Sequence, residues 1–342
     1  MKGYGECTVA GREDLPPTLG CRGLEASLGA FRCVRLRVEV KAQSTIHLPA
    51  YRGGALRGAF GTALKASCCV LKRQNCENCL LRTRCIYSYV FETPNGGVAE
   101  ETRRYATAPH PFVLNLEIGG EEVCERGSLF SFGITLVGRA VEFLPYFVFA
   151  FRRMGELGLG KGRGNFTVTR LMALNGEDRE VETVYTDGTL QMPRAALSLE
   201  DALAACERLP GDRLRMRLLT PLRLVYGGEL CREPAFHVLV RNLLRRLGNL
   251  TLFHCDESAP ALDGRLIDLA EEVRLARRNT RWHDWERYSH RQDKRMKLGG
   301  ILGELDYEGD LAPFLPLLVL GSWVNLGKNT TFGLGRYRLE GV

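Results

Sequence analysis

The chain contains an internal repeat. Residues 143–168 align without a gap with residues 314–339, at an offset of 171 residues, which is half of the 342-residue length. In this alignment Gly162 falls on Gly333. A repeat at this distance predicts a duplicated domain, in which each copy ends with an apolar helix, a glycine-rich basic loop and a last strand.

The order of patterned segments within each copy predicts its fold. Residues 35–41 alternate apolar and charged side chains, which indicates a strand, and residues 53–66 repeat apolar positions at helical spacing. Two strand-like runs, an apolar helix and a last strand complete the order β-α-β-β-α-β, the ferredoxin-like unit. The second copy begins with the same alternation at residues 213–219, and its middle strands are inferred largely from the repeat. We therefore predict an α+β fold with two tandem ferredoxin-like domains.

Composition sets the expected domain boundaries. The N-terminal residues are rich in Gly and Pro, and an acidic, polar stretch separates the two copies. We expect an irregular arm at 1–28, a first domain at 29–174, a linker at 175–210 and a second domain at 211–342. The first domain carries a cysteine-rich insertion at 67–92.

The bulk composition is that of a globular protein, with 45% apolar and 25% charged residues. The sequence has no run of about 18 apolar residues that could span a membrane. The N-terminal residues also lack the apolar core of a secretory signal. We therefore expect a cytoplasmic protein without a membrane partner.

The net charge of +7 is concentrated in one window. Residues 274–297 contain nine Lys or Arg and three acidic residues, with Trp282, Trp285 and Tyr288 interleaved. Cations bind phosphate and flat rings stack on bases, which is how proteins hold single-stranded nucleic acid. The alternative is a solvated helix face whose aromatic side chains turn to the core. The residues expected to contact nucleic acid here are Arg281, Arg291, Gln292, Lys294, Arg295 and Lys297.

The two glycine-rich loops predict further contacts with the ligand. Glycine lets backbone N–H groups approach a ligand closely, and cations lie beside the glycines in both copies. The alternative is a tight, closely packed turn. A nucleotide-hydrolysing loop is disfavoured, because Gly162 stands where that loop needs Ser or Thr. The expected contact residues are Gly160, Lys161, Gly162 and Arg163 in the first loop and Lys328, Gly333, Gly335 and Arg336 in the second.

Four cysteines of the insertion have the spacing of a metal site. Cys76 and Cys79 form a C-x2-C pair, Cys69 precedes them, Cys85 follows them, and Cys68 is an adjacent spare. Thiolates on a short knuckle and two flanking arms suit tetrahedral Zn²⁺. In a cytosolic chain this pattern favours a metal over disulfides, with an iron–sulfur cluster and free thiols as alternatives. We expect one structural Zn²⁺ and no catalytic metal.

Four segments together resemble the RAMP superfamily of CRISPR systems and, within it, the endoribonucleases that process CRISPR repeat RNA. They are residues 48–64, 287–305, 326–339 and the cysteine insertion, and the resemblance runs from about residue 31 to the end. It implies metal-independent RNA cleavage, in which a base, usually His, takes the proton of a ribose 2′-OH. The oxygen then attacks the adjacent phosphate and leaves a 2′,3′-cyclic phosphate, while Lys or Arg stabilises the phosphate charge.

The chain departs from the family pattern at the second loop. Relatives often have a His-Val-Gly-Lys run there, whereas this chain has Asn325 in place of the His, and an amide does not titrate. There is also no Tyr in the first helix, where some relatives place a catalytic one. We therefore predict His290 as the base, His47 as the second choice, and Lys328 as the residue that stabilises the phosphate. A surface or structural role is the alternative for each His.

The resemblance implies CRISPR repeat or guide RNA as the partner, with other CRISPR effector subunits as further candidates. The alternative function is a non-catalytic RAMP subunit that holds guide RNA within an effector complex. A zinc-stabilised single-strand binder unrelated to CRISPR is a third hypothesis. A titratable group beside the scissile phosphate distinguishes the enzyme from both binding proteins.

Overall fold

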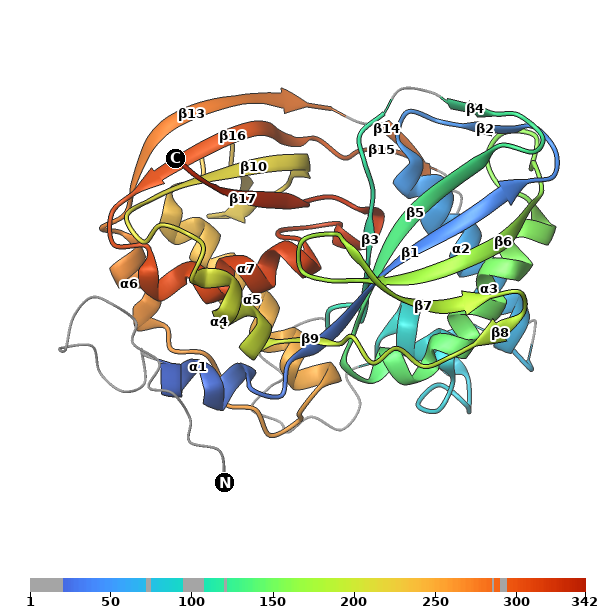
Figure 1. Ribbon diagram of the computed structural model, residues 1–342, viewed down its shortest axis with the longest axis horizontal. Coiled ribbons are helices and arrows are strands. Elements are labelled where there is room, and N and C mark those ends of the chain that lie inside the picture. The colour runs from blue at the N-terminus through green and yellow to red at the C-terminus, as the bar shows by residue number, and fades with distance from the viewer. Residues whose placement is uncertain (1–20, 72–74, 95–107, 120–121, 285, 290–293) are drawn as a thin grey trace.

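Two α+β units lie side by side, each built on an antiparallel sheet with helices packed on one face (Figure 1). The computed structural model describes residues 21–71, 75–94, 108–119, 122–284, 286–289 and 294–342.

In the first unit the sheet has the order β3-β5-β1-β6, and every neighbouring pair of these strands is antiparallel. Helices α2 and α3 pack on this sheet and share one apolar core with it. This order and connectivity define a ferredoxin-like unit. Its elements are β1 (Arg32–Ala42), α2 (Arg52–Cys68), β3 (Phe112–Asn115), β5 (Leu129–Val137), α3 (Leu144–Leu157) and β6 (Phe166–Leu174).

The second unit repeats this topology, with the strand order β13-β16-β10-β17 and antiparallel neighbours. The prediction of an α+β fold with tandem ferredoxin-like units is confirmed, and β13 and β16 are the middle strands that the sequence marked poorly. The elements are β10 (Arg213–Leu222), α5 (Phe236–His254), β13 (Arg274–His283), β16 (Gly300–Glu308), α7 (Leu315–Val324) and β17 (Tyr337–Gly341).

The alternation in β1 explains how the first core forms. Leu36 and Val38 are buried against the helices, while Arg37 between them points to the opposite face. On α2 the buried residues recur at helical spacing, and Phe60 lies at their centre. Its ring is 5.3 Å from that of Phe147 on α3, so the two helices are joined by aromatic packing.

The described part of the expected N-terminal arm is regular. Residues 21–28 form α1 (Cys21–Leu28), and Leu24 and Leu28 are buried in the core of the second unit. The expectation of irregular structure is therefore wrong for these residues. The two leucines are one helical turn apart, which lets both face the same core.

The segment 175–210, expected to be a linker, also carries structure. Strands β7 (Glu180–Thr186) and β8 (Thr189–Leu190) extend the first sheet beyond β6. Strand β9 (Leu197–Ser198) pairs with β1, and α4 (Leu199–Cys206) follows with a capping box in its first turn. The segment connects the units, but it packs against them instead of forming a free tether.

The remaining elements are short. They are β2 (Ile46–Leu48), η1 (Cys76–Asn78), η2 (Ser88–Glu92), β4 (Glu122–Cys124), η4 (Gly138–Phe143), β11 (Val225–Tyr226), β12 (Glu229–Leu230), α6 (Arg265–Ala270), β14 (Glu286–Ser289), β15 (Lys294–Lys297), η5 (Ala312–Phe314) and η6 (Thr330–Phe332). Among the helices of the described residues, none combines the length and apolar character needed to cross a bilayer.

The two units meet in close contact at His254. A Cβ at Gly138 would lie 2.0 Å from the His254 carbonyl oxygen, so only glycine fits this position. The His254 ring lies within hydrogen-bonding distance of the first unit at both nitrogens: Nδ1 is 3.1 Å from the Tyr89 hydroxyl and Nε2 is 2.7 Å from the Pro109 carbonyl oxygen. His254 is therefore a structural residue of the boundary between the units.

Candidate nucleic-acid interface

The second glycine-rich loop is inserted between the two units. At its turn, the Phe332 carbonyl oxygen accepts a hydrogen bond from the Tyr51 hydroxyl at 3.1 Å. The guanidinium of Arg57 lies 4.5 Å from the centre of the Phe332 ring and donates to the Thr331 hydroxyl at 3.1 Å. The second glycine-rich loop thus packs against the N-terminal part of α2. Sequence reasoning missed Tyr51, which directly precedes α2 as its N-cap.

The glycines of the second loop serve packing. Gly335 has φ +74°, and a Cβ there would lie 1.7 Å from the Leu326 carbonyl oxygen. Gly333 has φ +86° and lies against Leu116 of the first unit. Both glycines are buried, so a ligand does not reach them in this arrangement. The closely packed turn, the alternative interpretation of the loop, describes these two residues. The last strand, β17, begins after this turn, at Tyr337.

Asn325 is a buried residue of the same boundary. Its side chain is 0% exposed, and its Nδ2 donates to the Leu114 carbonyl oxygen at 3.3 Å. It ends α7 with φ +59°, and its carbonyl oxygen accepts from Arg246 Nε at 2.7 Å. Where relatives often carry His, this chain therefore has a structural amide that is closed to solvent.

Lys328 is the exposed cation of the second loop. Its backbone N–H donates to the Arg223 carbonyl oxygen at 2.8 Å, and the Arg223 side chain donates to the Gly299 carbonyl oxygen at 2.8 Å. Gly299 follows β15, the second strand of the hairpin formed by β14 and β15. Leu298 beside it is buried in a small core with Tyr51, Phe332 and Leu334. These contacts place Lys328 at the base of the hairpin.

The first glycine-rich loop, in contrast, is open. Gly160 packs on β2, where a Cβ would lie 2.1 Å from the His47 carbonyl oxygen. That oxygen accepts the backbone N–H of Lys161 at 3.0 Å. Lys161, Gly162 and Arg163 are exposed, and no atom lies within 4 Å of a Cβ built on Gly162. This loop can therefore present backbone and charge to a ligand, and His47, also exposed, lies directly beside it.

One short segment joins both loops. It begins at β2, where His47 contacts the first loop, and ends at Gly53, where a Cβ would lie 1.9 Å from the Phe332 carbonyl oxygen of the second loop. Seven residues, 47–53, therefore contact both glycine-rich loops, one at each end of the segment.

The basic window forms strands. Its first part is β13, and its second part is the β14–β15 hairpin, so the helix-face alternative is wrong. Arg281 is exposed on β13. The Trp282 indole N–H donates to Asp284 at 2.8 Å, and Arg232 lies 4.8 Å from the centre of the indole ring. Of the other expected contacts, Lys294, Arg295 and Lys297 belong to β15, whereas His290, Arg291 and Gln292 fall outside the described residues.

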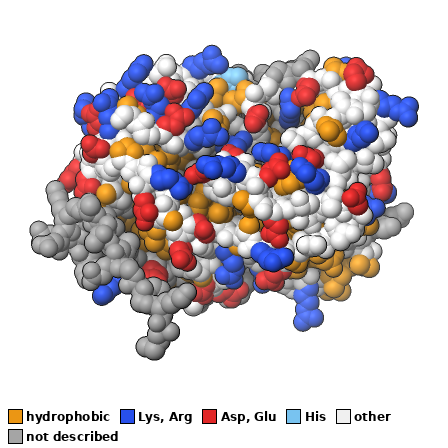
Figure 2. Space-filling view, viewed as in Figure 1, with side chains coloured by type: hydrophobic (Ala, Val, Ile, Leu, Met, Phe, Trp, Pro, Cys, Tyr) orange, Lys and Arg blue, Asp and Glu red, His pale blue; other side chains and the backbone are white. Residues whose placement is uncertain are grey.

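Some of the cations form ion pairs with acidic side chains, and others have no acidic partner among the described residues and can contact RNA. Arg215 pairs with Asp306 at 2.7 Å. Figure 2 shows Lys and Arg interspersed with acidic side chains on the face that it views. Within the described part of the chain, the exposed side chains of Lys161, Arg163 and Lys328 form no such pair. These three cations are free to contact phosphate.

Arg336 has a different environment from the one the sequence predicts. Its guanidinium pairs with Asp178 at 2.9 Å and donates to the Leu116 carbonyl oxygen at 3.3 Å. The side chain is 12% exposed. Arg336 therefore holds the two units together in this structure, and Asp178, within the expected linker, is the partner that sequence patterns did not reveal.

The described residues of the cysteine insertion do not gather into a metal site. Cys76 and Cys79 lie on a tight turn at η1, and Cys69 ends α2. The Cys68 thiol donates to the Leu64 carbonyl oxygen at 3.0 Å, and burial raises its pKa to about 11. Across the residues that the structure describes, no group of three or more His, Cys, Asp or Glu is placed to hold a metal ion. The described side chains thus do not by themselves form a zinc site, and Zn²⁺ binding by Cys69, Cys76, Cys79 and Cys85 stays a prediction.

Comparisons with known families agree with this architecture. A model of the CRISPR-associated endoribonuclease Cas6 matches residues 216–337, and a model described as an N-terminal domain matches residues 31–197. An Archaeoglobus fulgidus protein described as uncharacterized is 24% identical over 310 residues, which cover 86% of this chain and 93% of that protein.

Solved structures show the same fold. Thermus thermophilus Cas6 is 15% identical with a TM-score of 0.53, and the likeness covers 91% of this chain and 99% of that one. A chain of a partial Cas6-RT-Cas1–Cas2 complex is 14% identical with a TM-score of 0.54, over 91% of this chain and 46% of that one. The protein thus resembles the Cas6 endoribonucleases by a family model over residues 216–337, and it shares the fold of a solved Cas6 structure over 91% of its length.

Proposed function

We propose that this protein binds CRISPR repeat RNA and cleaves it without a metal ion. The observation that carries the proposal is the exposed His47 beside the open first loop. The His47 carbonyl oxygen accepts a hydrogen bond from the Lys161 backbone N–H at 3.0 Å. An imidazole, the side chain that most often serves as a general base, thus lies next to free cations. The Cas6 model supports the proposal in the second unit, because it spans the basic hairpin and Lys328.

The reaction needs a base, an acid and positive charge. The base takes the proton of the 2′-OH, and that oxygen forms a bond to phosphorus while the bond to the 5′-oxygen of the next nucleotide breaks. The acid protonates the departing oxygen, so the products are a 2′,3′-cyclic phosphate and a 5′-OH end. Lys328 and Lys161 are suited to stabilise the added charge on the phosphate because both are exposed and unpaired in the described structure.

Two histidines are candidates for the base. His290 remains our first choice from the sequence, since it lies in the basic window between Ser289 and Arg291. His47 is the candidate whose surroundings the structure describes. Removal of a general base typically lowers the rate about 10²–10⁴-fold, while substrate binding is retained.

A second function is favoured by Asn325. Because this residue is buried and cannot titrate, a family position that often carries His offers no base here. The protein would then be a non-catalytic subunit that holds guide RNA, with other CRISPR proteins as its partners. The titratable group next to the scissile phosphate decides between the two functions.

The test is incubation of the protein with repeat RNA in EDTA, with detection of a discrete cyclic-phosphate product. A substrate with a 2′-deoxy nucleotide before the cut should not react, because the nucleophile is missing. His290→Ala and His47→Ala identify the base, and His237→Ala on α5 is the matched control. Tight binding of repeat RNA without cleavage would favour the guide-holding subunit, and inhibition by EDTA would contradict the metal-free mechanism.

A further inference from the structure

Asp178 is the centre of an ion-pair cluster between the two units. It lies in the turn between β6 and β7 with φ +66°. Its carboxylate pairs with Arg35 of β1 at 2.5 Å, with Arg336 at 2.9 Å and with Arg338 of β17 at 3.6 Å. One carboxylate from the first unit therefore binds two arginines of the second.

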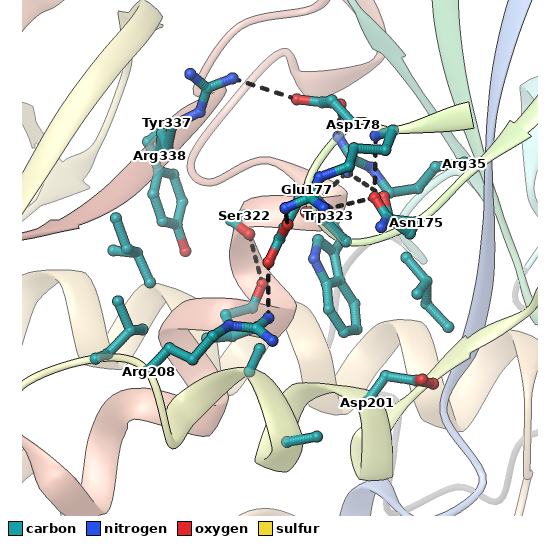
Figure 3. A pocket seen from close by; sticks show the side chains of 18 of the residues that line it. Arg35, Asn175, Glu177, Asp178, Asp201, Arg208, Ser322, Trp323, Tyr337 and Arg338 are labelled. Carbon is teal, nitrogen blue, oxygen red and sulfur yellow. Dashed lines mark hydrogen bonds and ion pairs between the residues drawn. The ribbon is translucent and has the colours of Figure 1, made fainter. Parts of the chain in front are cut away.

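The cluster lies at a cleft of about 660 Å³ between the units (Figure 3). The turn that carries Asp178 forms one wall, and α4, α7 and β17 form the others. Beside Asp178, Glu177 pairs at 2.8 Å with Arg208, which lies two residues after α4. The turn is thus bound by charge on two sides, and Figure 3 shows it between Arg338 and Arg208.

Of the two principal partners of Asp178, Arg35 is buried and Arg336 is partly buried. The side chain of Arg35 is 4% exposed, and that of Arg336 is 12% exposed. Within the cluster Asp178 is the carboxylate that neutralises both. If it is removed, the buried Arg35 guanidinium and the partly buried Arg336 guanidinium lose their counter-ion, and such a loss is strongly destabilising for the local arrangement.

Arg336 connects this cluster to the second glycine-rich loop. It follows Gly335 directly, and its backbone N–H donates to the Thr220 hydroxyl at 2.8 Å. The Gly335 carbonyl oxygen accepts the Leu326 N–H at 2.9 Å, two residues before Lys328. A fixed Arg336 therefore fixes both ends of the loop on which Lys328 is exposed.

We propose that Asp178 is a positioning residue: by holding Arg336 against the first unit, it sets the place of the second glycine-rich loop and Lys328 relative to the first loop and His47. The effect on RNA rests on the proposed function, whereas the effect on the loop does not. Asp178 itself touches neither RNA nor the reacting atoms, and it acts through Arg336.

The test compares two aspartates of one β-meander. Asp178→Asn removes the charge and keeps a side chain that tolerates positive φ. Asp187→Asn is the matched control, because Asp187 also lies in a turn with positive φ, at +49°, but is exposed and forms no ion pair with the described residues. Asp178→Glu keeps the negative charge and tests whether a carboxylate at this position is sufficient. Arg336→Gln removes the positive partner of the same ion pair.

Two readouts are measured on the full chain. Hydrogen exchange at the amides of Leu326 and Gly335 should become at least about tenfold faster in Asp178→Asn and Arg336→Gln, and unchanged in Asp187→Asn. Single-turnover cleavage at saturating repeat RNA should fall about 10²-fold in Asp178→Asn, with a smaller change in RNA affinity, because misplacement costs rate. Asp178→Glu should recover part of the rate.

The two readouts separate the two proposals. Unchanged exchange in both Asp178→Asn and Arg336→Gln overturns the positioning role, whatever the RNA assays show. Faster exchange in a protein that never cuts repeat RNA overturns the proposed reaction and leaves the positioning role intact. Equal losses with Asp187→Asn would overturn the assignment to Asp178, because the effect would then belong to any turn of the meander.

Discussion

Gly53 lies directly against Phe332: a Cβ on Gly53 would be 1.9 Å from the Phe332 carbonyl oxygen, although the residues are in different units. The first turn of α2 therefore closes on the second glycine-rich loop without space for a methyl group. The fit of this contact determines where the loop sits relative to the first unit.

Gly53→Ala should lower the free energy of unfolding by about 1–3 kcal/mol, because the backbone of Phe332 must move to admit the methyl group. Gly58→Ala in the same helix is the control, since nothing lies within 4 Å of a Cβ there. It should be neutral or stabilising by about 0.5–1 kcal/mol through helix propensity. Urea denaturation measures both, and equal effects would contradict the close contact.

Removal of the free cations of the glycine-rich loops should weaken RNA binding and its salt dependence. For Lys161→Ala, Arg163→Ala and Lys328→Ala, each lost phosphate contact should lower the log–log salt slope by roughly 0.7. Arg37→Gln is the control, because Arg37 already pairs with Glu180 at 2.9 Å. A salt titration with repeat RNA measures the slopes, and parent-like slopes would mean that the loops are only packed turns.

The basic hairpin should contribute in the same way. A triple Ala variant of Arg291, Lys294 and Arg295 should bind repeat RNA more weakly and with a slope lowered by about 2. If it binds like the parent at every salt concentration, the concentration of charge in this window serves no RNA contact. The circular dichroism spectrum of the variant checks that the fold is retained.

Stability should decrease in mild acid because of two histidines near the boundary of the units. Burial lowers the pKa of His254 to about 4, and burial does the same for His110. The unfolded chain takes up these protons near pH 6.5, so the stabilisation is complete above that pH and is lost as pH falls toward 4. The slope should reach about 1.4 kcal/mol per pH unit for each histidine.

Denaturant titrations between pH 7 and pH 4.5 check this prediction. His254→Gln should reduce the slope of unfolding free energy against pH by the contribution of one histidine, because a neutral amide replaces the titrating ring. Carboxylates contribute equally to both proteins, so the difference between the profiles isolates His254. Parallel profiles would show that His254 is not buried as a neutral ring.

The cysteine insertion should bind about one equivalent of Zn²⁺ in the purified protein. Elemental analysis tests this, and less than about half an equivalent of Zn or Fe would contradict it. Cys79→Ser should lower the melting temperature before it lowers RNA affinity per folded molecule, because a structural metal contributes folding energy. Cys231→Ser, half-buried in the second unit, is the control.

Local patterns determined the sheets and helices of this protein. The alternation at residues 35–41 predicted the centre of β1, which spans Arg32–Ala42, and the apolar spacing at 53–66 predicted α2, which spans Arg52–Cys68. The repeat supplied β13 and β16, whose own patterns are weak. The alternation and the helical spacing are local features, because side-chain periodicity follows from backbone geometry within one element.

The tertiary structure decided what the repeated loops do. The sequence treats the two loops as equals, yet Gly162 is open while Gly333 and Gly335 are buried. The sequence also predicts that Arg336 contacts a ligand, whereas in the structure the Arg336 guanidinium forms an ion pair with Asp178. Burial and ion pairing depend on residues far apart along the chain, and no local pattern encodes which surface will cover a loop.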